Sequence, residues 1–228
     1  MKRTRTDNGH TELSHCRLRR GSGKAVIRMD AVVYIHGKGG SAAEAEHYRR
    51  LFPERDMIGL AYKGSTPWEA GQEIHGAITK LKTAYDRITL IANSIGAYFS
   101  MNADIEGYVA YAFFISPIVD MEKLITDMMG RARVTETELR ECGVVHTDFG
   151  EDLSWEYLCY VREHPVDWHI PTDILYGSGD ELTSIDAITA FARAHHAGLT
   201  VMEHGEHWFH TEEQMRFLDH WIKSRSDS

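Results

Sequence analysis

The chain has 228 residues, of which 43% are hydrophobic and 26% are charged, a composition typical of folded globular proteins rather than disordered or fibrous ones. Its formal net charge of -9 disfavours a nucleic-acid surface, because phosphate binding requires clustered Lys and Arg with little opposing charge. No apolar run is long enough to span a membrane and no Pro/Gly/Ser-rich linker divides the sequence, so we expect one domain over residues 1–228.

The cysteines and the start of the chain indicate in which cellular compartment the protein is located. Cys16, Cys142 and Cys159 are odd in number and form no C-x-x-C pair, which suits a reducing environment better than a disulfide framework. The basic start MKRTRT is not followed by the apolar run of a secretory signal. We therefore predict a cytoplasmic protein whose cysteines are small apolar residues.

Short apolar runs rich in β-branched and aromatic residues alternate with longer amphipathic segments along the chain. This alternation predicts an α/β fold with a mostly parallel sheet flanked by helices. The predicted strands, in chain order, are 31–35, 57–62, 88–92, 108–116, 173–177 and 199–204. The predicted helices are 67–85, 184–196 and 211–224. The first 30 residues have a weaker pattern, which we interpret as an antiparallel hairpin that leads into the sheet.

The segment 119–167 breaks the alternation, because it contains helix-like pieces without a convincing strand between them. We interpret it as a helical insertion over one edge of the sheet. Met121, Trp155, Tyr157 and Tyr160 in this insertion have two readings: they pack it against the sheet, or they line a pocket for an acyl group.

A serine stands where the predicted strand 88–92 ends and a helical pattern begins. A nucleophilic serine requires a sharp strand-to-helix turn, which tolerates only small residues two positions before and after it because the two backbones nearly touch. Ala92 and Gly96 occupy those positions around Ser94. The sequence ANSIG therefore resembles the G-x-S-x-G nucleophile elbow of the α/β-hydrolase superfamily, with alanine in place of the first glycine. The structural alternative is that Ser94 caps the following helix.

The predicted strand 31–35 leads into the sequence HGKGG at 36–40. In the superfamily that the elbow resembles, an HG-containing loop at this point supplies one of two backbone N–H donors to the oxyanion. The resemblance thus implies an oxyanion hole formed by the amides of Lys38 and Ile95. The alternatives are a plain Gly-rich turn or a phosphate-binding loop, although the spacing of a phosphate loop is absent.

The same resemblance implies a Ser-Asp-His triad with the residues in that chain order. Asp180 follows the predicted strand 173–177 within SGDE, and His207 follows the strand 199–204 within GEHWF. A serine hydroxyl becomes a strong nucleophile when a histidine takes its proton and a carboxylate orients that histidine. The implied catalytic residues are Ser94, Asp180 and His207.

Two alternatives compete for these residues. Asp120 follows the predicted strand 108–116 and is a rival for the acid, although its other reading is the N-terminal cap of a helix. His204, His207 and His210 are three residues apart and suggest a metal cluster, but the spacing is not H-E-x-x-H and no matching further ligand follows. We therefore expect no metal and no cofactor.

The resemblance implies a serine hydrolase that cleaves a small carboxylic ester through an acyl-enzyme intermediate. Its partner would be a small-molecule acyl substrate, contacted by Gly37, Gly39, Met121 and Trp208. A thioesterase or a short-peptide hydrolase would need the same groups, and a non-catalytic, receptor-like ligand-binding protein is the alternative from another class. The oligomeric state stays open, with a homodimer among the options.

Overall fold

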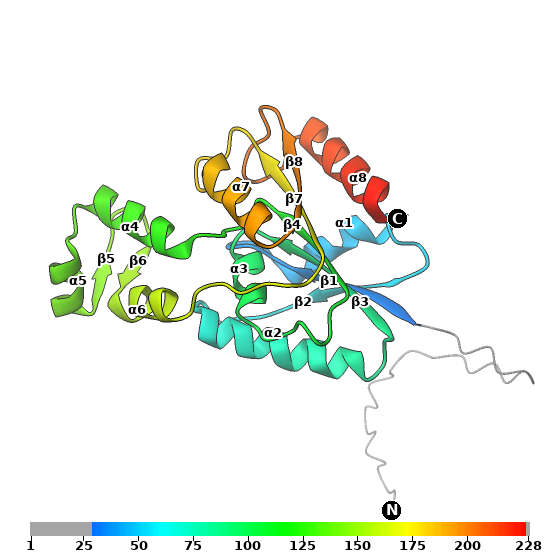
Figure 1. Cartoon of the computed structure of the whole chain (residues 1–228), viewed down its shortest axis with the longest axis horizontal. Coiled ribbons are helices and arrows are strands. Elements are labelled where there is room, and N and C mark those ends of the chain that lie inside the picture. The colour runs from blue at the N-terminus through cyan, green and yellow to red at the C-terminus, as the bar shows by residue number, and fades with distance from the viewer. Residues whose placement is uncertain (1–28, 227–228) are drawn as a thin grey trace, which may run out of the picture.

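A six-stranded parallel sheet forms the centre of the computed structural model, which describes residues 29–226 (Figure 1). The strands are β1 (Asp30–Ile35), β2 (Asp56–Leu60), β3 (Arg87–Asn93), β4 (Tyr111–Ile115), β7 (Thr172–Gly177) and β8 (Gly198–Met202). Their order across the sheet is β2-β1-β3-β4-β7-β8, and every neighbouring pair is parallel. The predicted hairpin in the first 30 residues lies almost wholly outside the described residues.

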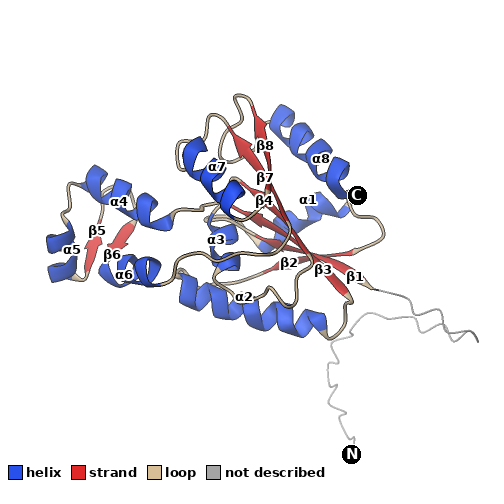
Figure 2. Ribbon diagram, in the orientation of Figure 1, coloured by secondary structure: helices blue, strands red, loops and turns tan. Residues whose placement is uncertain are grey.

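Helices cover both faces of this sheet (Figure 2). One face carries α2 (Pro67–Lys82), α3 (Ile95–Met101) and α7 (Ile185–Ala194), and the other carries α1 (Ala45–Arg49) and α8 (Glu212–Ser226). Within residues 29–226, no helix combines the length and the apolar composition needed to cross a membrane.

The strands are apolar on both sides because each face is covered. In β1, Val33 and Ile35 join the cluster that includes Ile74 of α2, whereas Val32 joins the cluster that includes Trp221 of α8. This period of two divides the core into two layers, one on each side of the sheet. Because all six strands are parallel, their carboxyl ends lie along one edge, where ligands of open α/β sheets bind.

Several predicted boundaries differ from the structure. The strand predicted over 108–116 begins only at Tyr111, because the amides of Tyr108 and Val109 donate to the carbonyl of Ile105 at 3.0 and 3.1 Å and form a turn. The strand predicted over 57–62 ends at Leu60, and the helix predicted over 67–85 ends at Lys82.

Two short helical segments between β1 and β2 were not predicted. They are the 3-10 turn η1 (Ala42–Glu44) and α1, which together are too short to display a helical repeat of apolar residues. Their apolar side chains Ala45 and Tyr48 are nevertheless buried against the sheet.

The insertion lies between β4 and β7, as predicted, and forms a lobe beyond the carboxyl end of β4 (Figure 1). It contains α4 (Met121–Ala132), α5 (Glu136–Cys142), α6 (Trp155–Glu163) and an antiparallel pair of strands, β5 (Val144–His146) and β6 (Asp152–Ser154). The interpretation of 119–167 as a segment without strands was therefore wrong. The two strands have three residues each, which is too short for a readable alternation.

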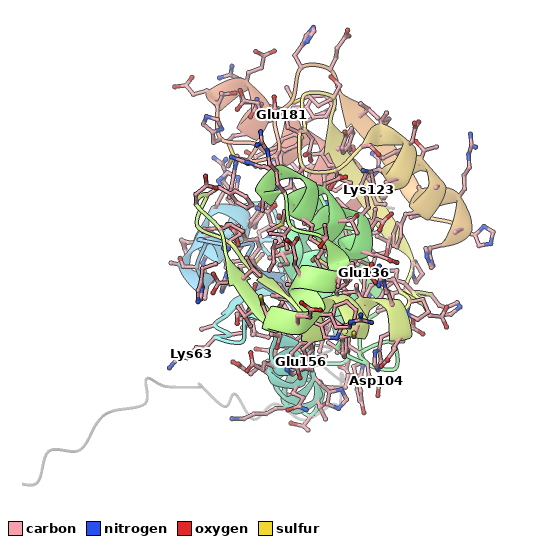
Figure 3. The ribbon with its side chains drawn as sticks, turned by 90° about the vertical axis from the view of Figure 1, so that its left-hand side faces the viewer. Lys63, Asp104, Lys123, Glu136, Glu156 and Glu181 are labelled. Carbon is pink, nitrogen blue, oxygen red and sulfur yellow. The ribbon has the colours of Figure 1, made fainter. Side chains whose placement is uncertain are left out.

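Charged side chains cover the outer surface of the lobe, as the labelled Lys123, Glu136 and Glu156 show in Figure 3. Arg162 of α6 binds Glu122 of α4 at 2.7 Å and Glu136 of α5 at 2.9 Å. One guanidinium therefore ties the three helices of the lobe together.

Candidate active site

Ser94 stands at the turn between β3 and α3, with φ 52° and ψ -122°. Positive φ is strained for a serine, at a cost of about 1–3 kcal/mol, and such residues concentrate at functional sites. Within the described residues, the Ser94 hydroxyl makes no capping hydrogen bond to α3. The reading of Ser94 as a helix cap is therefore wrong, because its side chain points elsewhere.

Close backbone approach explains the small residues around this turn. A side chain at Gly96 would collide with the carbonyl oxygen of His36, and its Cβ would lie 2.9 Å from the carbonyl oxygen of Ile35. A Cβ at Gly37 would lie 3.1 Å from the Cβ of Ser94. The turn at Ser94 and the HGKGG loop are thus in direct contact, and Gly96 is needed because α3 approaches the end of β1.

This contact predicts a large difference between two glycines that are both in helices. We expect Gly96→Ala to destabilise the protein by about 1–3 kcal/mol, because the added methyl group meets backbone that cannot rotate away. Gly76→Ala in α2 meets nothing within 4 Å in the described structure and should stabilise by about 1 kcal/mol, the usual helix preference of alanine over glycine. Urea unfolding of both variants measures this, and equal midpoints would contradict the steric account.

Ser94, His207 and Asp180 form a continuous hydrogen-bonded chain. His207 Nε2 lies 2.8 Å from Ser94 Oγ, and His207 Nδ1 lies 2.7 Å from Asp180 Oδ2. A carboxylate only accepts, so Nδ1 carries the proton and Nε2 is free to accept from the serine hydroxyl. The residues are buried, with exposed fractions of 7% for Ser94, 5% for His207 and 0% for the Asp180 side chain.

The loop after β7 holds Asp180 in place through its second oxygen. Asp180 Oδ1 accepts from the amides of Leu182 at 2.8 Å and Thr183 at 3.2 Å. The hydroxyl of Tyr176 donates to the carbonyl of Thr183 at 2.7 Å. Burial raises the pKa of Tyr176, and the nearby Asp180 charge adds to this shift, so the hydroxyl stays a donor at neutral pH.

The residues considered as alternatives, Asp120, His204 and His210, lie outside this hydrogen-bonded chain. Asp120 is exposed and accepts from the amide of Lys123 at 2.9 Å, so it caps α4. His204 and His210 are exposed and lie beside Glu203 and Glu206 rather than beside His207. In the described residues, no group of three or more His, Cys, Asp or Glu is arranged to hold a metal ion.

The two amides assigned to the oxyanion hole lie at the loops that meet around Ser94. No hydrogen bond found within residues 29–226 uses the N–H of Lys38 or of Ile95 as its donor. Gly39 has φ 74°, and Gly40 N donates to Gly37 O at 3.2 Å, so the HGKGG loop is a tight turn that needs glycine at Gly39. The ammonium group of Lys38 pairs with Glu151 in the loop between β5 and β6.

The four residues assigned to substrate contact lie in different surroundings. Gly37 is buried against Ser94, whereas Gly39 is exposed at the turn. Met121 is 5% exposed and packs inside the core cluster, where it holds the lobe to the sheet. Trp208 is 57% exposed, and its ring lies edge-on to the His207 ring with centroids 5.6 Å apart.

Two aromatic residues that were not predicted lie at the HGKGG loop and at the lobe, respectively: Tyr62 and Trp68. Tyr62 follows β2 and stacks on the His36 ring with centroids 4.3 Å apart, while its hydroxyl donates to the His36 carbonyl at 2.8 Å. Trp68 in the first turn of α2 contacts the lobe. No motif marks either residue, and Tyr62 reaches the HGKGG loop because the carboxyl end of β2 lies beside that of β1.

Several solved structures have a backbone similar to that of this chain. No family model matches the chain, and no curated protein matches it either. A protein from Agrobacterium vitis S4, assigned provisionally as a hydrolase, has a TM-score of 0.71 at 16% identity, over 86% of this chain and 87% of its own. Mouse alpha/beta hydrolase domain-containing protein 10 has a TM-score of 0.66 at 16% identity, over 90% and 91% of the two chains. Est1E from Butyrivibrio proteoclasticus, solved with ferulic acid bound, has a TM-score of 0.65 at 15% identity, over 86% and 88%.

These structures superpose on the central sheet and its helices over most of both chains. At identities this low, what they share is the architecture of the backbone. The parallel sheet, its flanking helices and these similarities show that the chain has the α/β-hydrolase fold.

Proposed function

We propose that the protein is a serine hydrolase that cleaves small carboxylic esters. The observation that carries this proposal is the chain of hydrogen bonds from Asp180 through His207 to a Ser94 with positive φ. Nucleophilic catalysis requires a serine hydroxyl that can pass its proton to an imidazole, and a carboxylate that orients this imidazole. Ser94, His207 and Asp180 have this arrangement.

The chemistry follows from the positions of these groups. Ser94 Oγ would attack the acyl carbonyl while His207 Nε2 accepts the hydroxyl proton, and the amides of Lys38 and Ile95 would donate to the resulting oxyanion. The tetrahedral intermediate would then break its bond to the alcohol, which takes the proton from His207. Water, deprotonated by the same imidazole, would attack the acyl-enzyme and release the acid and free Ser94.

Steady turnover of a panel of activated substrates tests the proposal. The panel comprises 4-nitrophenyl esters of increasing acyl length, an acyl thioester and an aminoacyl 4-nitroanilide. We expect multiple turnovers on the short-chain esters at rates well above those on the anilide. Faster turnover of the thioester at equal acyl length would make the protein a thioesterase, and faster turnover of the anilide would make it a short-peptide hydrolase.

A ligand-binding protein without catalysis is the alternative from another class, and the same panel separates it. Release of one equivalent of 4-nitrophenol followed by no further turnover would favour that reading, as would tight retention of the acid product. The cytoplasmic location stays a prediction.

A further inference from the structure

A group of aromatic side chains lies beneath the lobe, on the side of the site next to the HGKGG loop. We name it the aromatic wall, and its members are Tyr62, Trp68, Tyr98, Tyr157 and Tyr160. The Trp68 ring contacts the rings of Tyr157 and Tyr160 of α6, with centroids 5.8 and 5.0 Å apart. The wall thus joins the lobe to the sheet domain.

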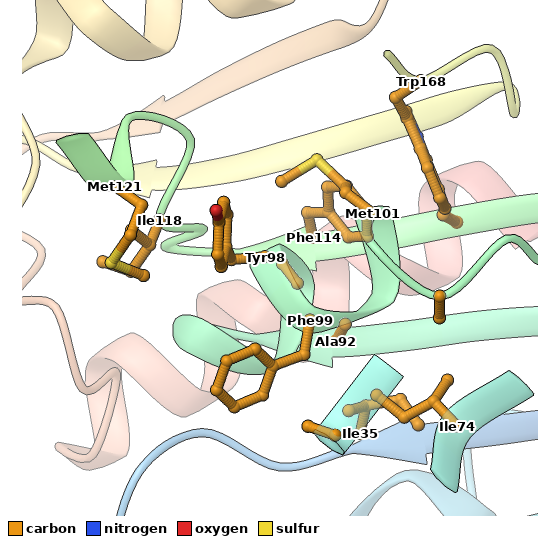
Figure 4. Close-up of a cluster of buried hydrophobic side chains, with 14 of the residues drawn as sticks. Ile35, Ile74, Ala92, Tyr98, Phe99, Met101, Phe114, Ile118, Met121 and Trp168 are labelled. Carbon is orange, nitrogen blue, oxygen red and sulfur yellow. The ribbon is translucent and has the colours of Figure 1, made fainter. Parts of the chain in front are cut away.

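The aromatic wall begins beside the nucleophile. Tyr62 stacks on His36, whose neighbour Gly37 packs against Ser94. Tyr98 lies one helical turn after Ser94 on α3, and Figure 4 shows it beside Ile118 and Met121, where the chain leaves β4 for the lobe. The aromatic wall therefore runs from the loop that contacts Ser94 to the helix α6 of the lobe.

The hydroxyl of Tyr157 is an unsatisfied polar group within this wall. Its oxygen is buried and has no hydrogen-bond partner among the described residues, whereas the Tyr62 hydroxyl binds the His36 carbonyl. Burial raises the pKa of Tyr157, and the nearby hydroxyls of Tyr98, Tyr160 and Tyr62 raise it further, so the group stays protonated. A protonated hydroxyl can both donate and accept, and a buried one without a partner is unfavourable.

The lobe meets the sheet domain through ring contacts of the tyrosine that carries this hydroxyl. The buried side chains of the lobe, such as Leu158 and Val161, belong to the same core cluster as those of α3 and β4, so the lobe is packed on the sheet domain. Side-chain contacts such as Trp68 with Tyr160, and the exposed pair of Lys38 with Glu151, link the two parts. A planar group that binds between Trp68 and α6 would replace the ring contacts of Trp68 with Tyr157 and Tyr160.

We propose that the Tyr157 hydroxyl is a specificity-determining group that binds a polar ring substituent of the substrate, so that the preferred acyl groups are hydroxylated aryl acids. The ring would pack edge-on or offset against Trp68 and Tyr62, as aromatic pairs prefer. The ring hydroxyl would complete the hydrogen bonding of Tyr157. This inference rests on the proposed serine hydrolase function and adds the class of acyl group.

Three methyl esters of one chain length test the proposal. They are methyl 3-(4-hydroxyphenyl)propanoate, methyl 3-phenylpropanoate and methyl 3-cyclohexylpropanoate. We expect kcat/KM to be about tenfold higher for the hydroxyphenyl ester than for the phenyl ester, the ratio that one satisfied buried hydrogen bond supplies. The phenyl ester should in turn exceed the cyclohexyl ester by a few-fold, because of the ring geometry.

The matched pair of variants is Tyr157→Phe and Tyr160→Phe, each of which keeps the ring and removes one hydroxyl. Tyr157→Phe should bring the hydroxyphenyl-to-phenyl ratio close to one, whereas Tyr160→Phe should keep it near the wild-type value. A wild-type ratio near one, or a ratio that survives in Tyr157→Phe, would overturn the assignment. A cyclohexyl ester as good as the phenyl ester would overturn its aryl part.

A failure of the proposed function can be told apart from a failure of this inference. Turnover of 4-nitrophenyl acetate, whose acyl group has no ring or ring hydroxyl, reports on the hydrolase alone. If that substrate is not turned over, the affinities of 3-(4-hydroxyphenyl)propanoate and 3-phenylpropanoate for the full chain can be compared by calorimetry. We expect the hydroxyphenyl acid to bind about tenfold more tightly. Equal affinities in that experiment would reject the role of Tyr157.

Discussion

Replacement of Ser94 by alanine is expected to lower kcat for ester hydrolysis by about four orders of magnitude or more, because the variant lacks the hydroxyl that forms the acyl-enzyme bond. The same variant should lose covalent labelling by a fluorophosphonate probe, which reacts with an activated serine rather than with an exposed one. The fold should persist, because the Ser94 hydroxyl makes no capping bond to the described part of α3 and alanine fits the same space. Intact mass after brief labelling, with peptide mapping of the adduct, measures the outcome.

Ser116 offers a matched control for this experiment. It follows β4 as Ser94 follows β3, it is buried, and it also has a positive φ, of 43°. Its hydroxyl has no partner within the described residues, so it lacks the imidazole that activates Ser94. Ser116→Ala should retain the adduct and the rate. An adduct that persists in Ser94→Ala, or its loss in Ser116→Ala alone, would show that Ser94 is not the nucleophile.

Replacement of Asp180 by asparagine is expected to lower kcat by about 10⁴-fold while the loop after β7 stays folded. The asparagine oxygen can still accept from the amides of Leu182 and Thr183, which keeps the loop in place. The other oxygen, which faces His207 Nδ1 at 2.7 Å, becomes an NH₂ group that donates. The imidazole would then carry its proton on Nε2 and could not accept the proton of Ser94. Steady-state kinetics on 4-nitrophenyl acetate, with urea unfolding as the check on stability, gives the result.

Asp120→Asn is the matched control, since Asp120 was the rival for the acid. Asparagine is as good an N-terminal cap as aspartate, so α4 should keep its cap and the rate should change by no more than about twofold. A large loss of rate in Asp120→Asn together with a normal rate in Asp180→Asn would reverse the assignment of the acid.

The alternation of strands and helices could be predicted from local patterns, because each parallel strand is an apolar run and each covering helix has one apolar face. The shortest elements could not. The three-residue strands β5 and β6 and the five-residue α1 carry too few residues for any period to emerge. The boundary errors at β2 and β4 have a related cause. Apolar residues outside the strands, Tyr62 after β2 and Val109 before β4, still pack against the core.

The sequence by itself determined which residues could form the site. The small residues around Ser94, the glycines of the HGKGG loop and the positions of Asp180 and His207 after predicted strands are all local features, set by how closely a backbone can approach at a turn. Only the tertiary structure decided how these residues meet. His207 and Ser94 are far apart in the chain, and the choice between Asp180 and Asp120 depends on which strand end lies beside His207, which the strand order β4-β7-β8 sets. The aromatic wall depends on the packing of the lobe on Trp68, and no periodicity or motif encodes a contact between side chains of separate elements.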